Sequence, residues 1–159
     1  MKTQNKYIQL MAVALAIFAL TEFAQARIGE TLAQCSKRYG RPVSTSGEVT
    51  VYRMAGFLVM VSTHQGVVDR ILYRKEAENV LGVPADISKD EIKMLLKSNA
   101  PTWEVARVAQ IGNWWRTPSE SLLSMWTPAE RHLIVTTEGW LERRRVKEKD
   151  EAARVTKGF

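Results

Sequence analysis

The sequence predicts an α+β protein in one domain, built from two units that each consist of a helix followed by an antiparallel meander. Three features indicate this fold class. Two capping boxes each begin a short amphipathic helix, alternating apolar runs follow each helix, and short breaks with glycine separate the runs. We expect the domain to span 27–141, with halves of 27–82 and 83–141, and a charged helix or mobile tail over 142–159.

The first 26 residues have the pattern of a secretory signal peptide. Two lysines precede an apolar run from Ile8 to Leu20, and the small residues Ala24 and Ala26 occupy the −3 and −1 positions of a cleavage site. The alternative is a retained anchor, but the run is shorter than the roughly 20 residues of a membrane-spanning helix. We therefore expect an exported protein, periplasmic or secreted, that begins at Arg27 and has no transmembrane segment after cleavage.

The first helix of the domain is expected to begin after Thr31. Thr31 and Gln34 have capping-box spacing, so that the hydroxyl can accept from the N3 amide and the glutamine side chain can bind the cap amide. Gly40 is suited to a left-handed C-terminal position, and Pro42 prevents further helix. One apolar stripe follows at helical spacing: Leu32, Cys35 and Tyr39.

Cys35 is the only cysteine, so the chain cannot form an internal disulfide. The letters LAQC superficially resemble a lipoprotein motif, but Gln34 stands where a small residue is expected, and the apolar run ends far upstream at Leu20. The position of Cys35 on the apolar stripe favours a core residue over a lipidated one. We therefore expect no lipidation.

Strands follow the first helix and the linker VSTSGE. The runs VTVYRM, FLVMVSTH and VVDRILYR are separated by Ala55-Gly56 and Gln65-Gly66, which is typical of hairpin turns. Alternation places Arg70 and Arg74 on the outward face of the third run. The inward face is expected to consist of Phe57, Val59, Val61, Ile71 and Tyr73.

The second half repeats this order. Ser88 and Glu91 form another capping box, and Asn99 and Pro101 end the helix. Its apolar side consists of Ile92, Leu95 and Leu96. The runs WEVARVAQ, NWWRT, SLLSMW and RHLIVTT follow, with TPAE as a hairpin turn.

The segment GETLAQCSKRYGRP resembles the opening helix of the SmpA/OmlA (BamE-type) family of small exported proteins, in which G-x-T-x-x-Q leads through a helix to G-x-P. The matching positions are Gly29, Thr31, Gln34, Gly40 and Pro42. The doubled helix-plus-meander order is also similar to the β-lactamase-inhibitor-protein-like fold. This resemblance covers roughly Arg27 to Arg74, and what it implies is the architecture.

Few residues in the chain suggest catalysis or metal binding. His64 and His132 are the only histidines, and no spacing typical of a transition-metal site occurs. His64 lies at a predicted turn near Asp69, and such a pair could orient a general base; a solvated turn histidine is the alternative that we favour. We expect no enzyme activity, no cofactor, no metal and no small-molecule ligand.

The second half contains all five tryptophans. Most of them are expected to fill the space between helix and sheet, but adjacent Trp114 and Trp115 must point to opposite faces of a strand. A ring outside the core could stack on a sugar or anchor a protein interface. The candidate partner-binding residues are Trp114, Trp115, Arg116 and Trp126.

The basic residues are concentrated near the C-terminus. The formal net charge is +6, and the segment from Leu141 to Phe159 has seven basic and four acidic residues. A nucleic-acid-binding face on the body is therefore not expected. Arg143, Arg144 and Arg145 could bind a polyanion, although the interspersed acids favour a solvated helix.

These features favour an exported, non-enzymatic module that binds a protein or cell-envelope partner through one sheet face or an aromatic rim. One alternative is a small carbohydrate-binding protein or hydrolase that uses the Trp-rich half. Another is a polyanion binder that uses the tail.

Overall fold

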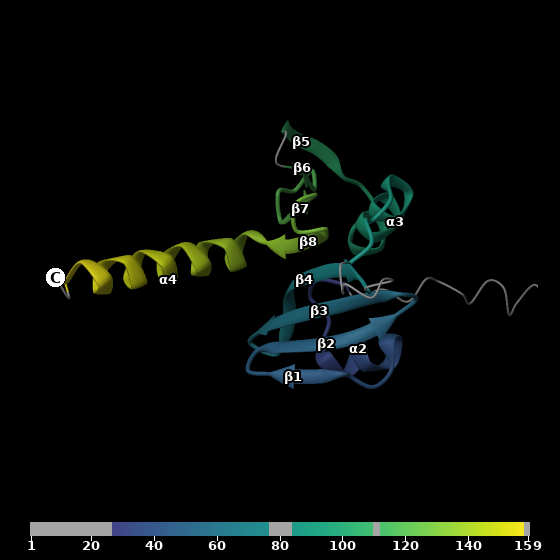
Figure 1. Ribbon diagram of the computed structural model, residues 1–159, viewed down its shortest axis with the longest axis horizontal. Coiled ribbons are helices and arrows are strands. Elements are labelled where there is room, and N and C mark those ends of the chain that lie inside the picture. Colours follow the sequence, from purple (N-terminus) through teal and green to yellow (C-terminus); the bar gives the residue numbers. More distant parts are fainter. Residues whose placement is uncertain (1–26, 77–83, 110–111, 158–159) are drawn as a thin grey trace, which may run out of the picture.

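The computed structural model describes residues 27–76, 84–109 and 112–157. These residues form one α+β domain with three helices and one antiparallel sheet of eight strands (Figure 1). The predicted fold class is confirmed at this level. The predicted signal peptide, residues 1–26, lies outside the described residues.

The sheet has the strand order β1-β2-β3-β4-β8-β7-β6-β5. Its strands are β1 (Ser44–Ser46), β2 (Val49–Met54), β3 (Phe57–His64), β4 (Val67–Lys75), β5 (Glu104–Ala109), β6 (Gly112–Arg116), β7 (Leu122–Thr127) and β8 (His132–Thr137). Two meanders, β1–β4 and β5–β8, therefore meet where β4 pairs with β8. Each meander has four strands, whereas the sequence predicts about three, and β1 lies in the segment predicted to be a linker.

The joint between the meanders is an antiparallel pair of central strands. Its register places Leu72 opposite Ile134 and Arg74 opposite His132. Because β4 and β8 both have neighbours on each side, neither has a free edge. The sheet is strongly twisted, so that the two meanders cross at a steep angle (Figure 1).

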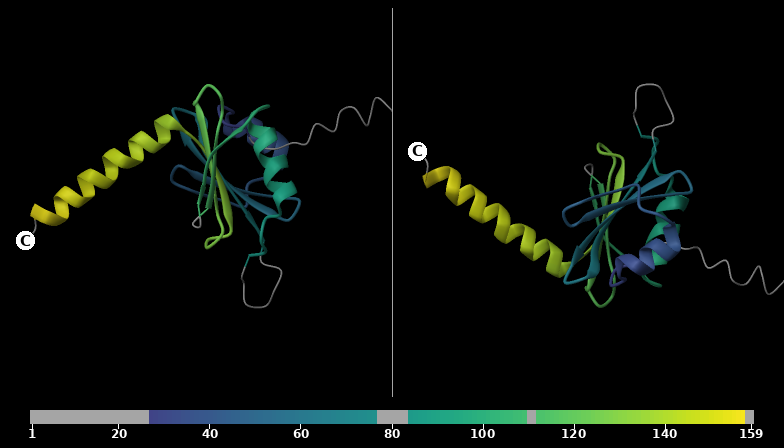
Figure 2. Two further views of the ribbon diagram at one scale, coloured as in Figure 1. Left: turned by 90° about the horizontal axis from the view of Figure 1, so that it is seen from above. Right: turned by 90° about the horizontal axis from the view of Figure 1, so that it is seen from below.

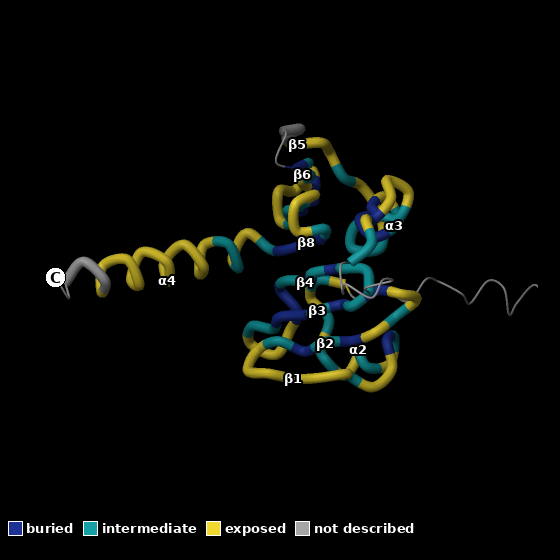
Figure 3. Tube along the Cα trace, viewed as in Figure 1, coloured by how far each residue is buried: buried dark blue, intermediate teal, exposed yellow. Residues whose placement is uncertain are grey.

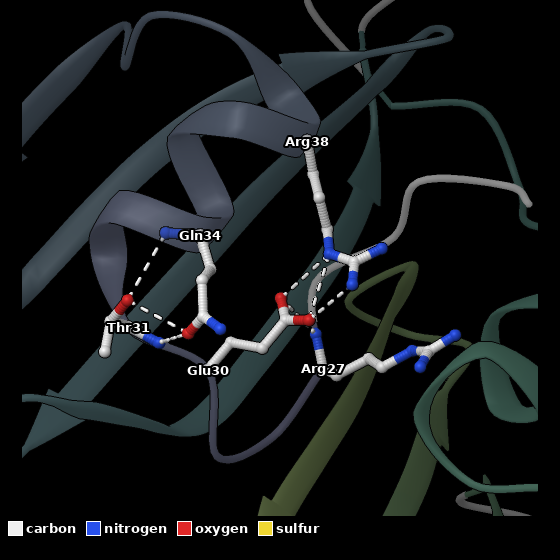
Figure 4. A network of polar contacts seen from close by, with 5 residues as sticks. All are labelled: Arg27, Glu30, Thr31, Gln34 and Arg38. Carbon is white, nitrogen blue, oxygen red and sulfur yellow. Dashed lines mark hydrogen bonds and ion pairs between the residues drawn. The ribbon is translucent and has the colours of Figure 1, made fainter.

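Local sequence signals determine the helix starts. Helix α2 (Leu32–Tyr39) begins with the Thr31–Gln34 capping box, and α3 (Lys89–Asn99) begins with the Ser88–Glu91 box. Figure 4 shows the first box, in which the Thr31 amide donates to Gln34 Oε1 at 2.8 Å and the Gln34 amide donates to Thr31 Oγ1 at 3.3 Å. Both predicted capping boxes are confirmed.

The same region contains an ion pair that fixes α2 to the segment before it. Arg38 Nε donates to Glu30 Oε1 at 2.9 Å, and the backbone amide of Arg27 reaches Glu30 Oε2 at 3.4 Å (Figure 4). The backbone of Glu30 in turn accepts from the Val68 amide at 2.7 Å. These contacts hold the start of α2 against the first residues of β4.

Both predicted hairpin turns in the first meander are confirmed. Ala55 and Gly56 have φ of 48° and 79°, and Gln65 and Gly66 have φ of 52° and 83°. Consecutive left-handed residues form the type I′ geometry that matches the twist of paired strands. The predicted TPAE turn also lies between β7 and β8, whose ends pair through Thr127 and His132.

Helices α2 and α3 cover one face of the sheet (Figure 2). The tyrosine hydroxyls of this face bind the helices: Tyr52 donates to the Leu32 carbonyl at 3.3 Å, and Tyr73 accepts from Asn99 Nδ2 at 3.1 Å. Each fully buried aliphatic side chain here contributes about 1.5–3 kcal/mol. The buried core consists of Cys35, Tyr39, Tyr52, Phe57, Val59, Val61, Val68, Ile71, Tyr73, Ile87, Ile92, Leu95, Leu96, Trp126, Leu133 and Val135.

Helix α4 (Glu138–Lys157) projects away from the domain (Figures 1 and 2). It begins four residues before the expected boundary at 142, because the Thr137 hydroxyl at the end of β8 accepts from the Trp140 amide at 3.1 Å. Every residue of the helix from Glu142 to Arg154 is exposed (Figure 3). No helix within 27–76, 84–109 and 112–157 has the length and apolar character needed to cross a membrane.

Candidate interaction surface

The sheet face opposite α2 and α3, here called the open face, has a continuous row of apolar side chains. Six neighbouring strands each contribute one residue, and the strand register places each of these residues directly opposite the one on the adjacent strand. This apolar row consists of Val51, Met60, Leu72, Ile134, Met125 and Trp114. All six side chains are partly exposed. A row of this kind on the sheet face that α2 and α3 leave uncovered is a candidate binding surface.

Two arginines lie on either side of this row on the central strand β4. Arg70 and Arg74 flank Leu72 on the open face, as the predicted outward alternation requires. Among the described residues, neither Arg70 Nε nor Arg74 Nε has a hydrogen-bond acceptor, although both atoms are buried. Burial lowers the pKa of Arg70, and the nearby Arg144 lowers it further. Two guanidinium groups therefore lie near the centre of the open face with their Nε donors unused among the described residues.

His132 lies next to these arginines on the open face. It lies opposite Arg74 in the β4–β8 register and is only 9% exposed. Burial lowers the pKa of His132, and Arg70 and Arg74 also lower it, while Glu130 raises it. Glu130 Oε2 lies 3.1 Å from His132 Nε2, so a carboxylate as well as the two guanidinium groups acts on this imidazole.

The first turns of α4 cover one end of the open face. Trp140 lies between two guanidinium groups, with the Arg70 Cζ 4.9 Å and the Arg144 Cζ 5.5 Å from its ring centroid. Such cation–π contacts are worth about 0.5–2 kcal/mol each. A cavity of about 70 Å³ beside Trp140 is also lined by Trp114 and Met125 of the apolar row. Ile134 lines the same cavity, so the first turns of α4 lie beside the part of the apolar row on β6, β7 and β8.

A β-bulge places a carboxylate under α4. The β3–β4 register shifts between Ser62 and Thr63, and Asp69 in β4 is the unpaired residue. Asp69 is 7% exposed and forms an ion pair with Arg143. Burial raises the pKa of Asp69, and Arg143 opposes this shift. Asp69 Oδ1 has no hydrogen-bond partner among the described residues.

A larger cavity of about 580 Å³ separates the β3–β4 hairpin from α4. Both His64 and Asp69 line it, so the structure brings the predicted pair to one cavity. The carboxylate of Asp69, however, pairs with Arg143, and no hydrogen bond joins it to His64 within the described part of the chain.

The predicted partner-binding residues are divided between the two faces. Trp126 is buried in the core, and Trp115 packs against the core. Trp114 belongs to the apolar row, and Arg116 lies two residues further on the same face, at an exposed position where it pairs with Glu120. Of the four predicted partner-binding residues, Trp114 and Arg116 are therefore the two that lie on the open face.

The three arginines predicted as a polyanion site have separate partners. Arg143 pairs with Asp69, Arg144 Nε pairs with Glu148 Oε1 at 2.7 Å, and Arg145 pairs with Glu142 at 3.4 Å. Their charges are thus matched within the chain. The pair of Arg143 with Asp69 anchors α4 to the sheet, whereas the pairs of Arg144 and Arg145 lie on the solvent-exposed surface of the helix.

Cys35 is fully buried. Burial, with a contribution from Glu30, raises the pKa of the Cys35 thiol to about 11. Its place in the core agrees with the predicted packing role. In the described residues, no group of three or more His, Cys, Asp or Glu side chains is arranged to hold a metal ion.

Sequence reasoning missed most of the apolar row, including Met60, Leu72, Met125 and Ile134. A signal was present, because runs such as FLVMV are apolar at both alternating positions and therefore predict a strand with two apolar faces. The assembly of these residues into one row depends on the pairing of β4 with β8. That pairing joins distant segments and has no local signature.

No family model and no curated protein matches this chain. Among solved structures, the chain is similar to a DUF4309 family protein, YjgB, from Bacillus subtilis subsp. subtilis str. 168. The two have 16% sequence identity, the match covers 69% of this chain and 79% of that chain, and the TM-score is 0.38. A likeness of this degree assigns neither a family nor a function.

Proposed function

We propose that this chain is an exported, non-enzymatic interaction module that binds a protein partner of the cell envelope on its open face. The observation that carries the proposal is the apolar row, which spans six strands on the face that α2 and α3 do not cover. Exposed apolar surface with a polar rim is typical of protein–protein interaction sites. The signal-peptide pattern of residues 1–26 supports export and, with it, a partner in the cell envelope.

The composition of the row supports a protein partner in particular. Met60 and Met125 are flexible side chains that adapt to a bound surface, and Trp114 supplies a large amphipathic ring at one end of the row. The charged rim limits the apolar area that water contacts in the free protein. We also infer that the two helix-plus-meander halves are repeats of one unit, which their common element order supports.

Carbohydrate binding is the second candidate, because Trp114 is a partly exposed ring on the open face. The other ring near this face, Trp140, has a guanidinium group within 6 Å of its centroid from both Arg70 and Arg144. These contacts compete with a stacked sugar. A protein partner uses the whole row, whereas a sugar would use one ring.

Site-specific photo-crosslinking in the producing cells tests the proposal. A photoreactive residue at Met125 should crosslink a discrete protein, because this position lies in the middle of the row's second half. The matched control is the same residue at Lys93 on α3, whose side chain is 79% exposed on the other side of the sheet. The Met125 crosslink should disappear when Met60→Glu is added.

Three outcomes would contradict the proposal. Equal crosslinks from Met125 and Lys93 would show that the open face has no preference. A glycan-binding isotherm abolished by Trp114→Ala in a folded protein would favour the second candidate. Catalytic turnover that vanished in His64→Ala would show an enzyme.

Intact mass of the fractionated protein tests export, since cleavage before Arg27 and lipidation of Cys35 give different masses.

A further inference from the structure

The charged side chains of the open face are distributed unevenly. Toward the sheet edges, Arg53 pairs with Glu76, and Arg116 pairs with Glu104 and Glu120. These arginines already have carboxylate partners. At the bulge, Asp69 forms an ion pair with Arg143, and its charge also favours the charged form of the neighbouring Arg70.

Arg70 and Arg74 are the exceptions. Neither forms an ion pair with any carboxylate in residues 27–76, 84–109 and 112–157, and the buried Nε of each has no acceptor there. A partly buried guanidinium without an anion is unfavourable, since its desolvation is not offset by a charge-assisted hydrogen bond. Arg74 thus presents an unfilled requirement for an anion on the proposed binding face, and Arg70, which contacts the Trp140 ring and lies near Asp69, presents a weaker one.

The position of the two arginines relative to the apolar row limits the kind of anion. They stand on opposite sides of Leu72, about 13 Å apart along β4 at the usual rise of a strand. A ligand that lies along the row therefore meets apolar side chains beneath it and one guanidinium on each flank. This pattern is complementary to an amphipathic polypeptide that has an apolar stripe with acidic residues on both sides.

Other occupants match this surface less well. A second copy of this chain, with a formal net charge of +6, would bring further positive charge. A nucleic acid would supply phosphates but would leave Met60, Leu72 and Ile134 without apolar partners. We propose that the open face binds an acidic amphipathic polypeptide segment whose carboxylates pair with Arg70 and Arg74 and whose apolar side chains cover the apolar row. This inference rests on the proposed function and names the chemistry of its partner.

Designed peptides test the charge preference directly. Three labelled 16-residue peptides have the same leucine stripe at helical spacing, with Glu, Gln or Lys in the flanking positions. Fluorescence anisotropy with the purified full chain should show the tightest binding for the Glu peptide. That binding should weaken as salt concentration rises, because exposed ion pairs are screened.

Arginine variants locate the interaction. Arg74→Gln and Arg70→Gln should each weaken binding of the Glu peptide by about tenfold, which corresponds to the loss of one charge-assisted hydrogen bond. The matched control is Arg53→Gln, on the same face but already paired with Glu76, which should change affinity by less than about twofold. Arg74→Glu should shift the preference toward the Lys peptide. Circular dichroism melts verify that each variant is folded.

The possible failures are distinguishable. If all three peptides bind equally and Met125→Glu abolishes their binding, the acidic partner is excluded while the proposed function stands. If no peptide binds, or if Arg53→Gln weakens binding as much as Arg74→Gln, the inference is overturned. Displacement of the Glu peptide by a single-stranded oligonucleotide at equal concentration would also overturn it, in favour of a general polyanion surface. If photoreactive residues at Met125 and Lys93 gave equal crosslinks in cells, the result would instead contradict the proposed function.

Discussion

Asp69 and Arg143 form an ion pair that joins the bulge of β4 to the second turn of α4, across 74 positions of the chain. With the contact between Arg70 of β4 and the Trp140 ring, this pair fixes the beginning of α4 to the edge of the open face. The remainder of the helix extends into solvent (Figure 3). The orientation of α4 therefore depends on a small number of side chains near its N-terminal end.

Removal of the Arg143 charge should release the first turns of α4. Arg143→Gln leaves Asp69 buried without its ion-pair partner, so local opening over 138–146 should become easier by about 1 kcal/mol. Amide hydrogen exchange measures this change. Arg145→Gln is the control, because Arg145 forms only a surface pair with Glu142 at 3.4 Å. Equal protection of 138–146 in wild type and Arg143→Gln would contradict the anchoring role.

The buried carboxylate should give the protein a pH-dependent stability term. Because burial raises the folded-state pKa of Asp69, the folded protein holds this proton more tightly than the unfolded chain. Its contribution to the free energy of unfolding is fully present below the ordinary aspartate pKa and is lost as pH rises through the raised value. Asp69→Asn lacks this term.

Urea denaturation of wild type and Asp69→Asn from about pH 3.5 to pH 6 isolates the effect, since the other carboxylates are common to both. The stability of wild type relative to Asp69→Asn should fall across this range. A relative stability that rises with pH would mean that the Arg143 pair outweighs the burial of Asp69.

The Cys35 thiol should be unreactive in the folded protein. It is fully buried, and its pKa is raised to about 11, so little thiolate forms at pH 8. Alkylation by iodoacetamide, followed by mass spectrometry, should be slow in buffer and rapid in denaturant. Fast labelling without denaturant would contradict the core position of this residue.

The two faces of the second meander should respond differently to loss of a tryptophan ring. Trp126 is 9% exposed in the core, so Trp126→Ala should lower the free energy of unfolding by about 3–5 kcal/mol. Trp114 is partly exposed on the open face, and Trp114→Ala should cost clearly less in the same denaturation experiment. Equal losses would show that Trp114 also serves mainly as a core residue.

The sequence could predict those elements whose signals are local. The two capping boxes and the type I′ turns at Ala55-Gly56 and Gln65-Gly66 involve residues within a few positions of one another. Strand β1 was missed because its three residues, Ser-Thr-Ser, are exposed and have no apolar alternation. The start of α4 was misplaced because a strand leads directly into a helix at Thr137 and Glu138.

The candidate surface was predictable only in part. Alternation correctly places Trp114 and Trp115 on opposite faces, and it places Arg70 and Arg74 outward. It could not show which face the helices cover, and so it grouped Trp126 with Trp114. The apolar row requires the β4–β8 register, which depends on packing between segments far apart in the chain.

The antiparallel β4–β8 pair also imposes an order of events in time. Its partners lie roughly sixty residues apart, so closing that loop costs conformational entropy before any contact across it forms. During emergence from a ribosome or a translocation channel, β4 would be an unpaired edge strand until β8 arrived. A chain with this topology therefore gains most from a chaperone during that interval, and folding on the millisecond-to-second scale of non-local β proteins is expected.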